Sequence, residues 1–178
     1  MTRAVPDGGP IEAHTDLVKK LDYECELAVV LGKDARNVPA GQTRDYIFGY
    51  TILNDVSARD VQTAHKQWYF GKSLDGFTPI GPCIVTADAF ADYPPRLGIR
   101  SFVNGEKRQD SNTALQIFDI DHVIAELSQG MTLKAGTIIA TGTPAGVGMG
   151  MDPPQFLKPG DVVRCEIDGI GTLTNPVK

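Results

Sequence analysis

The chain has 178 residues, 42% of them hydrophobic, and carries a formal net charge of −5 at pH 7, values that predict one globular domain with a substantial core. The acidic balance and the absence of a Lys/Arg cluster argue against nucleic acid or an anionic membrane as a partner. No stretch approaches the roughly 18 apolar residues of a membrane helix, and no basic start leads into an apolar block, so a cytoplasmic protein is expected.

The first half of the chain alternates short apolar runs with turn residues, a pattern that predicts a β-rich α+β domain. Residues 1–16 are rich in proline and glycine and are expected to be loosely ordered, ahead of a folded domain over 17–178. Buried strands are predicted over 24–32 and 50–56. Between these strands, residues 39–48 have helical character.

The second half of the chain continues with short elements and tight turns. Ser57 is a plausible N-cap for a helix that begins directly after the second strand. Asn104-Gly105 is a hairpin dipeptide, and residues 158–161 read as a tight turn before a strand. The other predicted elements are a loop over 71–82, strands over 83–87, 98–103, 137–141, 162–167 and 171–173, and an amphipathic helix over 121–129.

Two carboxylates stand two residues apart at the start of the first strand. Because side chains of a strand alternate between its faces, Glu24 and Glu26 project from the same face. Two like charges at that distance repel each other unless a cation lies between them. Oxygen ligands favour a hard ion such as Mg²⁺ or Mn²⁺ over Zn²⁺. Taken alone, the pair reads equally as solvated surface carboxylates, which are the commoner case.

Polar residues also follow the second strand. Asp55 is a candidate third oxygen ligand, although it could simply cap the next helix. In a helical continuation Arg59 and Gln62 lie on the same side as Asp55 and could face an anionic ligand. Arginine suits that task because its planar guanidinium donates two parallel hydrogen bonds to a carboxylate. The alternative for Arg59 is a surface ion pair with Asp55 or Asp60.

Two further candidates lie in segments rich in glycine. Lys72 lies between glycines and prolines in a tightly specified loop, where it could stabilise a developing enolate or simply be solvated. Thr143 lies in a glycine-rich turn after a strand and could offer its hydroxyl to a ligand carboxylate, or bond its own backbone. No Gly-x-Ser-x-Gly motif, HExxH motif or Cys/His pair with the spacing of a nucleophile is present, so covalent serine or cysteine catalysis has no support.

Taken together, five segments in register resemble the C-terminal catalytic domain of the fumarylacetoacetate hydrolase family, and the resemblance covers about residues 20–175. The segments are 22–30 (DYECELAVV), 49–60 (GYTILNDVSARD), 71–75 (GKSLD), 103–106 (VNGE) and 141–148 (TGTPAGVG). The resemblance implies a mixed β-sandwich roll, a homodimer and a Mg²⁺ or Mn²⁺ site. By position it implies Glu24, Glu26 and Asp55 as metal ligands, Arg59, Gln62, Lys72 and Thr143 as substrate-binding residues, and Lys72 and Arg59 as catalytic residues.

The resemblance further implies an enzyme of 2-oxo-acid and aromatic catabolism that cleaves a C–C bond in a β-diketo acid of the acylpyruvate or fumarylacetoacetate type. Hydrolytic members carry a water-activating His and Glu upstream of this region, and we expect this chain to lack them. Isomerisation or decarboxylation of hydroxymuconate-type diacids or oxaloacetate needs no activated water and is the alternative. A sugar-acid dehydratase, or a catalytically silent metal-binding domain without the N-terminal lid, are further alternatives.

Overall fold

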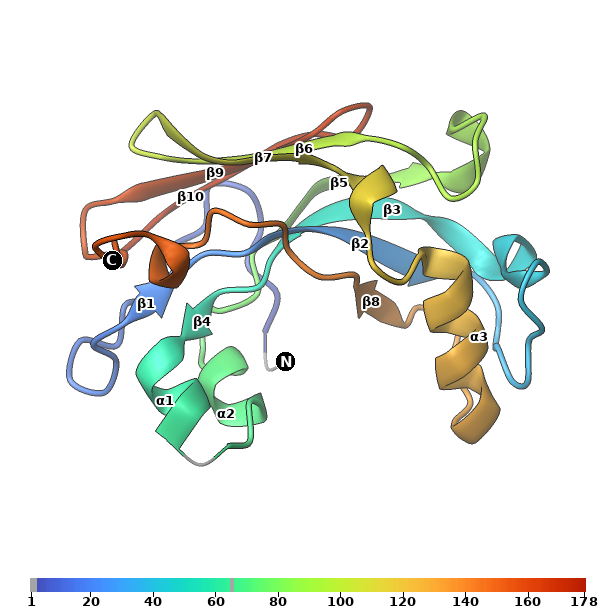
Figure 1. Ribbon diagram of the computed structural model, residues 1–178, viewed down its shortest axis with the longest axis horizontal. Helices are drawn as coiled ribbons and strands as arrows, with labels where there is room; N and C mark the ends of the chain where they lie inside the picture. The colour runs from blue at the N-terminus through green and yellow to red at the C-terminus, as the bar shows by residue number, and fades with distance from the viewer. Residues whose placement is uncertain (1–2, 65) are drawn as a thin grey trace.

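The computed structural model describes residues 3–64 and 66–178 and contains two four-stranded antiparallel sheets that face each other (Figure 1). The first sheet has the order β5 (Ile80–Thr86), β3 (Ile47–Asn54), β2 (Cys25–Leu31) and β8 (Ile138–Ala140). The second has the order β10 (Gly171–Pro176), β9 (Val162–Ile167), β6 (Gly98–Val103) and β7 (Glu106–Asn112). This sandwich confirms the predicted β-rich α+β class and the mixed β-sandwich roll.

Smaller elements lie on the outer side of the first sheet. A two-stranded ladder is formed by β1 (Leu21–Asp22) and β4 (Ser57–Ala58). Two short helices follow it, α1 (Arg59–Ala64) and α2 (Tyr69–Lys72). The longer helix α3 (Ile120–Gly130) lies at the other end of the first sheet, near β8 (Figure 1). The first sheet is therefore flanked on its outer side by α1 and α2 at one end and by α3 at the other.

The central strand β2 has two faces of different chemistry. Alternate residues from Cys25 to Leu31 belong to the hydrophobic core between the sheets, because successive side chains of a strand point in opposite directions. Glu24 and Glu26 are out of phase with those residues and project from the opposite, outer face of the first sheet. The sheet therefore packs against the core on one face and presents carboxylates on the other.

Several predicted strands are confirmed. The strands β6 and β9 match the predicted segments 98–103 and 162–167 residue for residue. The dipeptide Asn104-Gly105 connects β6 to β7 with φ angles of 53° and 84°, as a two-residue hairpin turn of the primed type requires. The predicted helix over 121–129 corresponds to α3, whose N-cap Asp119 accepts the backbone N–H of His122.

Two predicted local structures are wrong. Residues 39–48 contain only a 3₁₀ turn over Thr43–Tyr46, because Gly41 has a φ of +83° and Ile47 already pairs with Leu31 in the first sheet. Ser57 is not a helix cap, because it pairs with Asp22 in the β1–β4 ladder and its hydroxyl donates to the backbone of Asp55. The predicted loop over 71–82 also contains the end of α2 and the start of β5.

The first described residues lie against both sheets. The backbone N–H of Val5 donates to Thr78, and that of Ile11 donates to Pro176 at the end of β10. Val5 and Ile11 are both buried. The predicted division of the chain into residues 1–16 and 17–178 stays a prediction. Across the described residues, no helix is long and apolar enough to span a membrane.

The helices α1 and α2 touch through a glycine. A Cβ atom built on Gly71 would lie 2.6 Å from the backbone N of Gln62, a distance that side chains essentially never adopt. Glycine therefore allows α2 to lie directly against α1, which brings Lys72 at the end of α2 toward the first sheet. Trp68, immediately before α2, remains 64% exposed.

Candidate metal and substrate site

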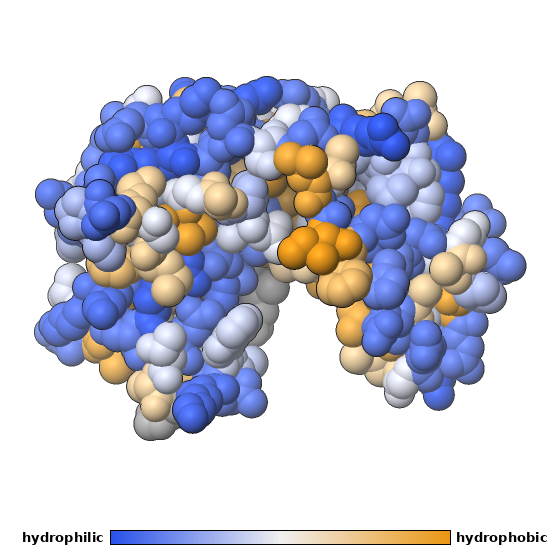
Figure 2. Space-filling model, viewed as in Figure 1, coloured by the Kyte–Doolittle hydropathy of each residue, from blue (hydrophilic) through white to orange (hydrophobic). Residues whose placement is uncertain are grey.

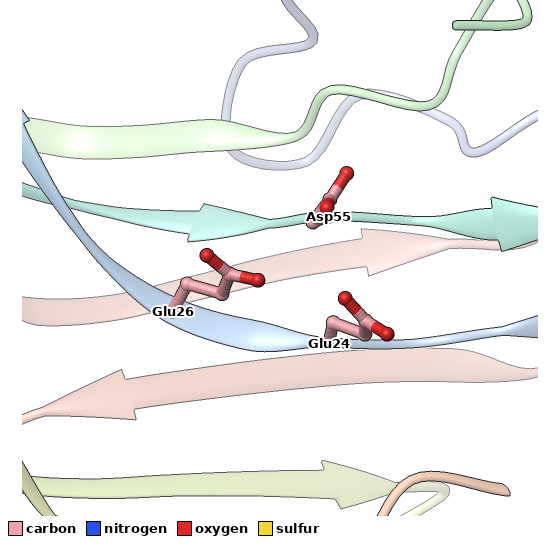
Figure 3. A group of neighbouring side chains, drawn as sticks. All are labelled: Glu24, Glu26 and Asp55. Carbon is pink, nitrogen blue, oxygen red and sulfur yellow. The ribbon is translucent and has the colours of Figure 1, made fainter. Parts of the chain in front are cut away.

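Three carboxylates converge on the outer face of the first sheet. Glu24 and Glu26 flank the first residue of β2, and Asp55 directly follows β3. The backbone N–H of Asp55 donates to the carbonyl of Glu24, which holds the two strand ends side by side. One carboxylate oxygen from each of the three residues lies within 4.8 Å of the other two (Figure 3). Residues from two distant segments of the sequence therefore form one acidic cluster.

A lysine ammonium contacts two carboxylates of this cluster. The Nζ atom of Lys72 lies 2.7 Å from Glu24 Oε2 and 2.7 Å from Asp55 Oδ2. Although burial favours the neutral amine, the carboxylates of Asp55 and Glu24 raise the pKa of Lys72 above its usual value. The ammonium group is therefore charged at neutral pH and bridges two of the three predicted metal ligands.

Arginine fixes the other side of Glu24. The Nη2 atom of Arg59 lies 2.6 Å from Glu24 Oε1, and its Nε donates to Asp22 Oδ2 at 2.9 Å. Its Nη1 donates to Gln62 Oε1 at 3.1 Å. Burial opposes the charge of Arg59, but Glu24 and Asp22 raise the pKa of Arg59 above its usual value. Arg59 is 5% exposed, so its guanidinium works inside the site and not in a surface ion pair.

The carboxyl group of Glu26 lacks the cationic partners that Glu24 has among the described residues. Its Oε2 accepts the backbone N–H of Gly142 at 2.7 Å, and the residue is 3% exposed. Burial, followed by the charge of Asp55 and with a smaller contribution from Glu24, raises the pKa of Glu26 to about 8. Burial likewise raises the pKa of Asp55, although Lys72 partly opposes the shift. The cluster therefore carries acids that are costly to ionise without a further cation.

The charges of the described residues fit a divalent cation. Four acidic residues belong to the network and only two cations, so full ionisation would leave a net charge of two minus. A divalent ion would balance that excess, and an all-oxygen donor set suits Mg²⁺ or Mn²⁺. Glu24, Glu26 and Asp55 are the residues that would hold it. The network members are Asp22, Glu24, Glu26, Asp55, Arg59 and Lys72.

Asp22 is a member of the network that is not among the predicted site residues. It is 0% exposed, and besides Arg59 it accepts the backbone N–H groups of Gly148 at 2.7 Å and Met149 at 3.0 Å. A signal was present in the sequence, because Asp22 precedes Glu24 by two residues and therefore continues the same alternation. Asp22 anchors both the arginine and the glycine-rich segment.

Thr143 is placed differently from the other predicted substrate-binding residues. Ala28 pairs with Ala140, and continuing that register sets Thr143 opposite Cys25, whose side chain points to the core. The Thr143 hydroxyl donates to the Cys25 carbonyl at 2.9 Å and accepts a bond from Gln109 at 2.8 Å. Its single proton is therefore engaged by the Cys25 carbonyl. A substrate contact for Thr143 stays a prediction.

The comparison with protein families gives one match over nearly the whole chain. The model described as fumarylacetoacetate (FAA) hydrolase C-terminal matches residues 2–178. Over 170 residues the chain is 48% identical to oxaloacetate tautomerase YisK of Bacillus subtilis strain 168, which covers 96% of this chain and 56% of that protein. The chain therefore spans little more than half the length of the curated relatives it matches.

Solved structures give the same architecture. The fumarylacetoacetate hydrolase from the psychrophile Exiguobacterium antarcticum is 51% identical with a TM-score of 0.95, over 98% of this chain and 62% of that one. The fumarylpyruvate hydrolase from Pseudomonas aeruginosa, solved with Mn²⁺ and pyruvate, is 29% identical with a TM-score of 0.86, over 99% of this chain and 74% of that one. These proteins share the sandwich described above.

Proposed function

This chain belongs to the fumarylacetoacetate hydrolase family, and from that premise we propose that it is a divalent-metal-dependent enzyme that forms an enolate from a 2-oxo acid. The observation that carries the proposal is the convergence of three carboxylate oxygens within 4.8 Å, beside a charged lysine. Glu24, Glu26 and Asp55 would hold Mg²⁺ or Mn²⁺. The solved relative with Mn²⁺ and pyruvate supports both the ion class and the ligand class.

The site residues divide the work of such a reaction. Bound by the three carboxylates, a divalent ion supplies Lewis-acid polarisation of the 2-oxo group. Lys72 holds a fixed positive charge at the edge of the cluster, where it would stabilise negative charge that develops on the substrate oxygen. Arg59 keeps Glu24 oriented, and Gln62 in turn orients Arg59. These roles are those expected of preorganised groups that need no rearrangement during the reaction.

The reaction class that we favour is keto–enol interconversion or decarboxylation of a diacid such as oxaloacetate. The support is the 48% identity to a relative named oxaloacetate tautomerase. Both reactions require enolate stabilisation and a proton carrier but no attacking water. Neither described histidine forms a hydrogen bond or an ion pair with the three carboxylates. His14 contacts the backbone of Asp75, and His122 pairs with Glu126 on α3. His65 lies outside the described residues.

C–C hydrolysis of an acylpyruvate or fumarylacetoacetate-type substrate is the second candidate. Two solved relatives named as hydrolases of this type favour it. The same enolate would be the leaving group, so the metal ligands and Lys72 would keep their roles. We further propose that the active form is a homodimer in the cytoplasm that acts on small molecules.

The test has two arms. First, Mn²⁺ is titrated into the wild-type protein and into Glu24→Ala/Glu26→Ala, and the free ion is measured by its paramagnetic resonance signal. Loss of high-affinity binding in the variant is expected, and equal affinity would reject the site. Second, oxaloacetate, acetylpyruvate and fumarylpyruvate are followed by ultraviolet absorbance with Mg²⁺ present. Enol decay without C–C cleavage indicates a tautomerase, and release of CO₂ from oxaloacetate indicates a decarboxylase. Cleavage of an acylpyruvate into two acids indicates a hydrolase, and metal binding without any turnover indicates a silent domain.

A further inference from the structure

Gln109 is a buried polar residue of the second sheet. It belongs to β7, is 0% exposed, and lies next to an irregularity in the ladder between β6 and β7. Ser101 pairs with Gln109 whereas the next residue, Phe102, pairs with Lys107, so one extra residue is inserted in β7. Bulges of this kind re-aim side chains. Here the Gln109 side chain crosses from the second sheet to the edge of β2 in the first.

The amide of Gln109 makes three hydrogen bonds with defined directions. Its Oε1 accepts the backbone N–H of Cys25 at 3.2 Å. Its Nε2 donates to Thr143 Oγ1 and to the carbonyl of Pro144, both at 2.8 Å. A backbone N–H can only donate and a carbonyl can only accept, so these partners fix which end of the amide is which. Thr143 itself donates to the carbonyl of Cys25, which closes the network.

The partners of Gln109 flank Glu26 on both sides. Cys25 lies between Glu24 and Glu26 in the sequence, so its backbone sets the path of the strand that carries both acids. Thr143 follows Gly142, whose N–H donates to Glu26 Oε2 at 2.7 Å. One buried side chain is therefore bonded to the strand that presents Glu26 and to the loop that holds one of its carboxylate oxygens.

The loop that contains Thr143 also touches β7 without any intervening side chain. A Cβ atom on Gly146 would lie 2.2 Å from the carbonyl oxygen of Arg108, and Gly146 has a φ of +107°. Tyr23, next to Glu24 in the sequence, donates its hydroxyl proton to the carbonyl of Gly146. The loop is thus held against β7 at Gly146 as well as at Thr143, which makes it a rigid support.

We propose that Gln109 is a positioning residue for Glu26 in divalent-cation binding, acting through the Cys25 backbone and through the Thr143–Gly142 loop. The inference rests on the proposed function, because it takes Glu26 as a ligand of the ion. By holding the Gly142 N–H on one oxygen of Glu26, Gln109 directs the other oxygen toward Glu24 and Asp55. Loss of a residue that orients a metal ligand typically weakens metal affinity by about 10- to 100-fold.

The experiment compares two buried amides. Asn175 in β10 is 1% exposed, and its Nδ2 donates to the carbonyls of Pro6 and Gly9, away from the carboxylates. Gln109→Met and Asn175→Leu both remove a buried amide without adding charge. Mn²⁺ affinity is measured for each by titration, and the thermal midpoint of each metal-free protein is recorded. We expect Gln109→Met to raise the dissociation constant at least about tenfold, and Asn175→Leu to leave it within about twofold although both midpoints fall.

A second pair of variants covers the case in which Gln109→Met does not fold. Thr143→Val removes the hydroxyl that links Gln109 to the loop but keeps the side-chain shape, and Thr143→Ser keeps the hydroxyl. We expect Thr143→Val to weaken Mn²⁺ binding several-fold and Thr143→Ser to restore it. Wild-type affinity in both Gln109→Met and Thr143→Val would overturn the inference.

The outcome also separates this inference from the proposed function. If Glu24→Ala/Glu26→Ala loses Mn²⁺ binding while Gln109→Met and Thr143→Val keep it, only the role of Gln109 is overturned. If Glu24→Ala/Glu26→Ala binds Mn²⁺ as the wild type does, the metal site itself is rejected and the role of Gln109 with it.

Discussion

Carboxylates occur in two contrasting environments in this molecule. On the second sheet, the exposed Asp110 and Asp168 lie beside Lys107 and Arg100, and hydrogen bonds from these cations hold the pKa of each carboxyl below its usual value. On the outer face of the first sheet, burial raises the pKa of Glu26 and of Asp55.

The opposite directions of these pKa shifts show how the carboxylates of each region affect folding stability. Exposed ion pairs keep their hydration and contribute little to folding. Buried carboxylates lose hydration, and attraction to a neighbouring cation compensates for that loss only in part. A protein that retains several such groups in one place gives up stability there, which is the usual mark of a functional site. Most of the surface that is visible in Figure 2 is hydrophilic.

The largest effect on stability is expected when a fully buried charge is removed. Asp22→Asn leaves Arg59 with one ionic partner fewer and removes an acceptor from the N–H groups of Gly148 and Met149. We expect the free energy of unfolding to fall by about 3–5 kcal/mol, because Arg59 loses one of its two carboxylate partners and buried backbone N–H groups lose an acceptor oxygen. Urea denaturation measures the change. A loss as small as that of an exposed pair would contradict the assignment of Asp22 to a buried network.

The second prediction concerns turnover. In Lys72→Met the ammonium that lies 2.7 Å from Glu24 and Asp55 is lost while the side chain keeps its length. We expect kcat on the identified 2-oxo acid to fall by about 10²–10³-fold, which is typical when one preorganised stabilising group is removed. Lys107→Met on the second sheet is the control and should keep wild-type kcat. Equal activity in both variants would show that Lys72 only balances charge.

The third prediction is the pH dependence of the metal-free protein. The pKa of Glu26 is about 8 in the folded state, whereas its ordinary value is 4.5, so between these values the folded state binds more protons than the unfolded state. The contribution of protonated Glu26 to the free energy of unfolding is thus complete below pH 4.5 and is lost as pH rises toward 8. The loss is on the order of a few kcal/mol.

Glu26→Gln removes this titration. We expect the variant to have a higher thermal midpoint than the metal-free wild type at pH 8, and the difference to vanish near pH 4.5. Midpoints recorded across this range without Mn²⁺ measure the effect, and Mn²⁺ titration should show weakened binding in the same variant. Parallel pH profiles for the two proteins would mean that Glu26 ionises normally.

The smallest effect is expected on the second sheet. The pKa of Asp168 is held low by Arg100, so the contribution of Asp168 is present above its ordinary pKa and is lost as pH falls through the lowered value. Because the pair is exposed, Asp168→Asn at neutral pH should leave the thermal midpoint within the scatter of replicate measurements. A clear drop in the thermal midpoint would mean that the exposed ion pair also contributes to folding stability.

The sequence predicts the sandwich better than it predicts the site. Segments such as 98–103 and 162–167 are recognisable because alternation and flanking glycines are local properties. The helix predicted over 39–48 fails, because pairing of Ile47 with β2 overrides a weak local preference. Local patterns cannot reveal that Lys72 bridges two acids, since this contact depends on the packing of α2 against α1.

For the acids, alternation alone places Glu24 and Glu26 on one face, whereas the distance to Asp55 follows from strand pairing that no local pattern contains. Thr143 shows the converse: its segment is easily recognised, but the register that sets its hydroxyl opposite Cys25 exists only in the folded sheet.

The exposed indole ahead of α2 provides an optical reporter. Trp68 is the one tryptophan in the chain, and it stands four residues before Lys72 with 64% of its surface in water. Its emission is therefore expected at long wavelength, and any ligand that shields this end of the helix pair should shift the spectrum to the blue. Association that covers Trp68 can thus be followed by intrinsic fluorescence, without a dye or a coupled assay.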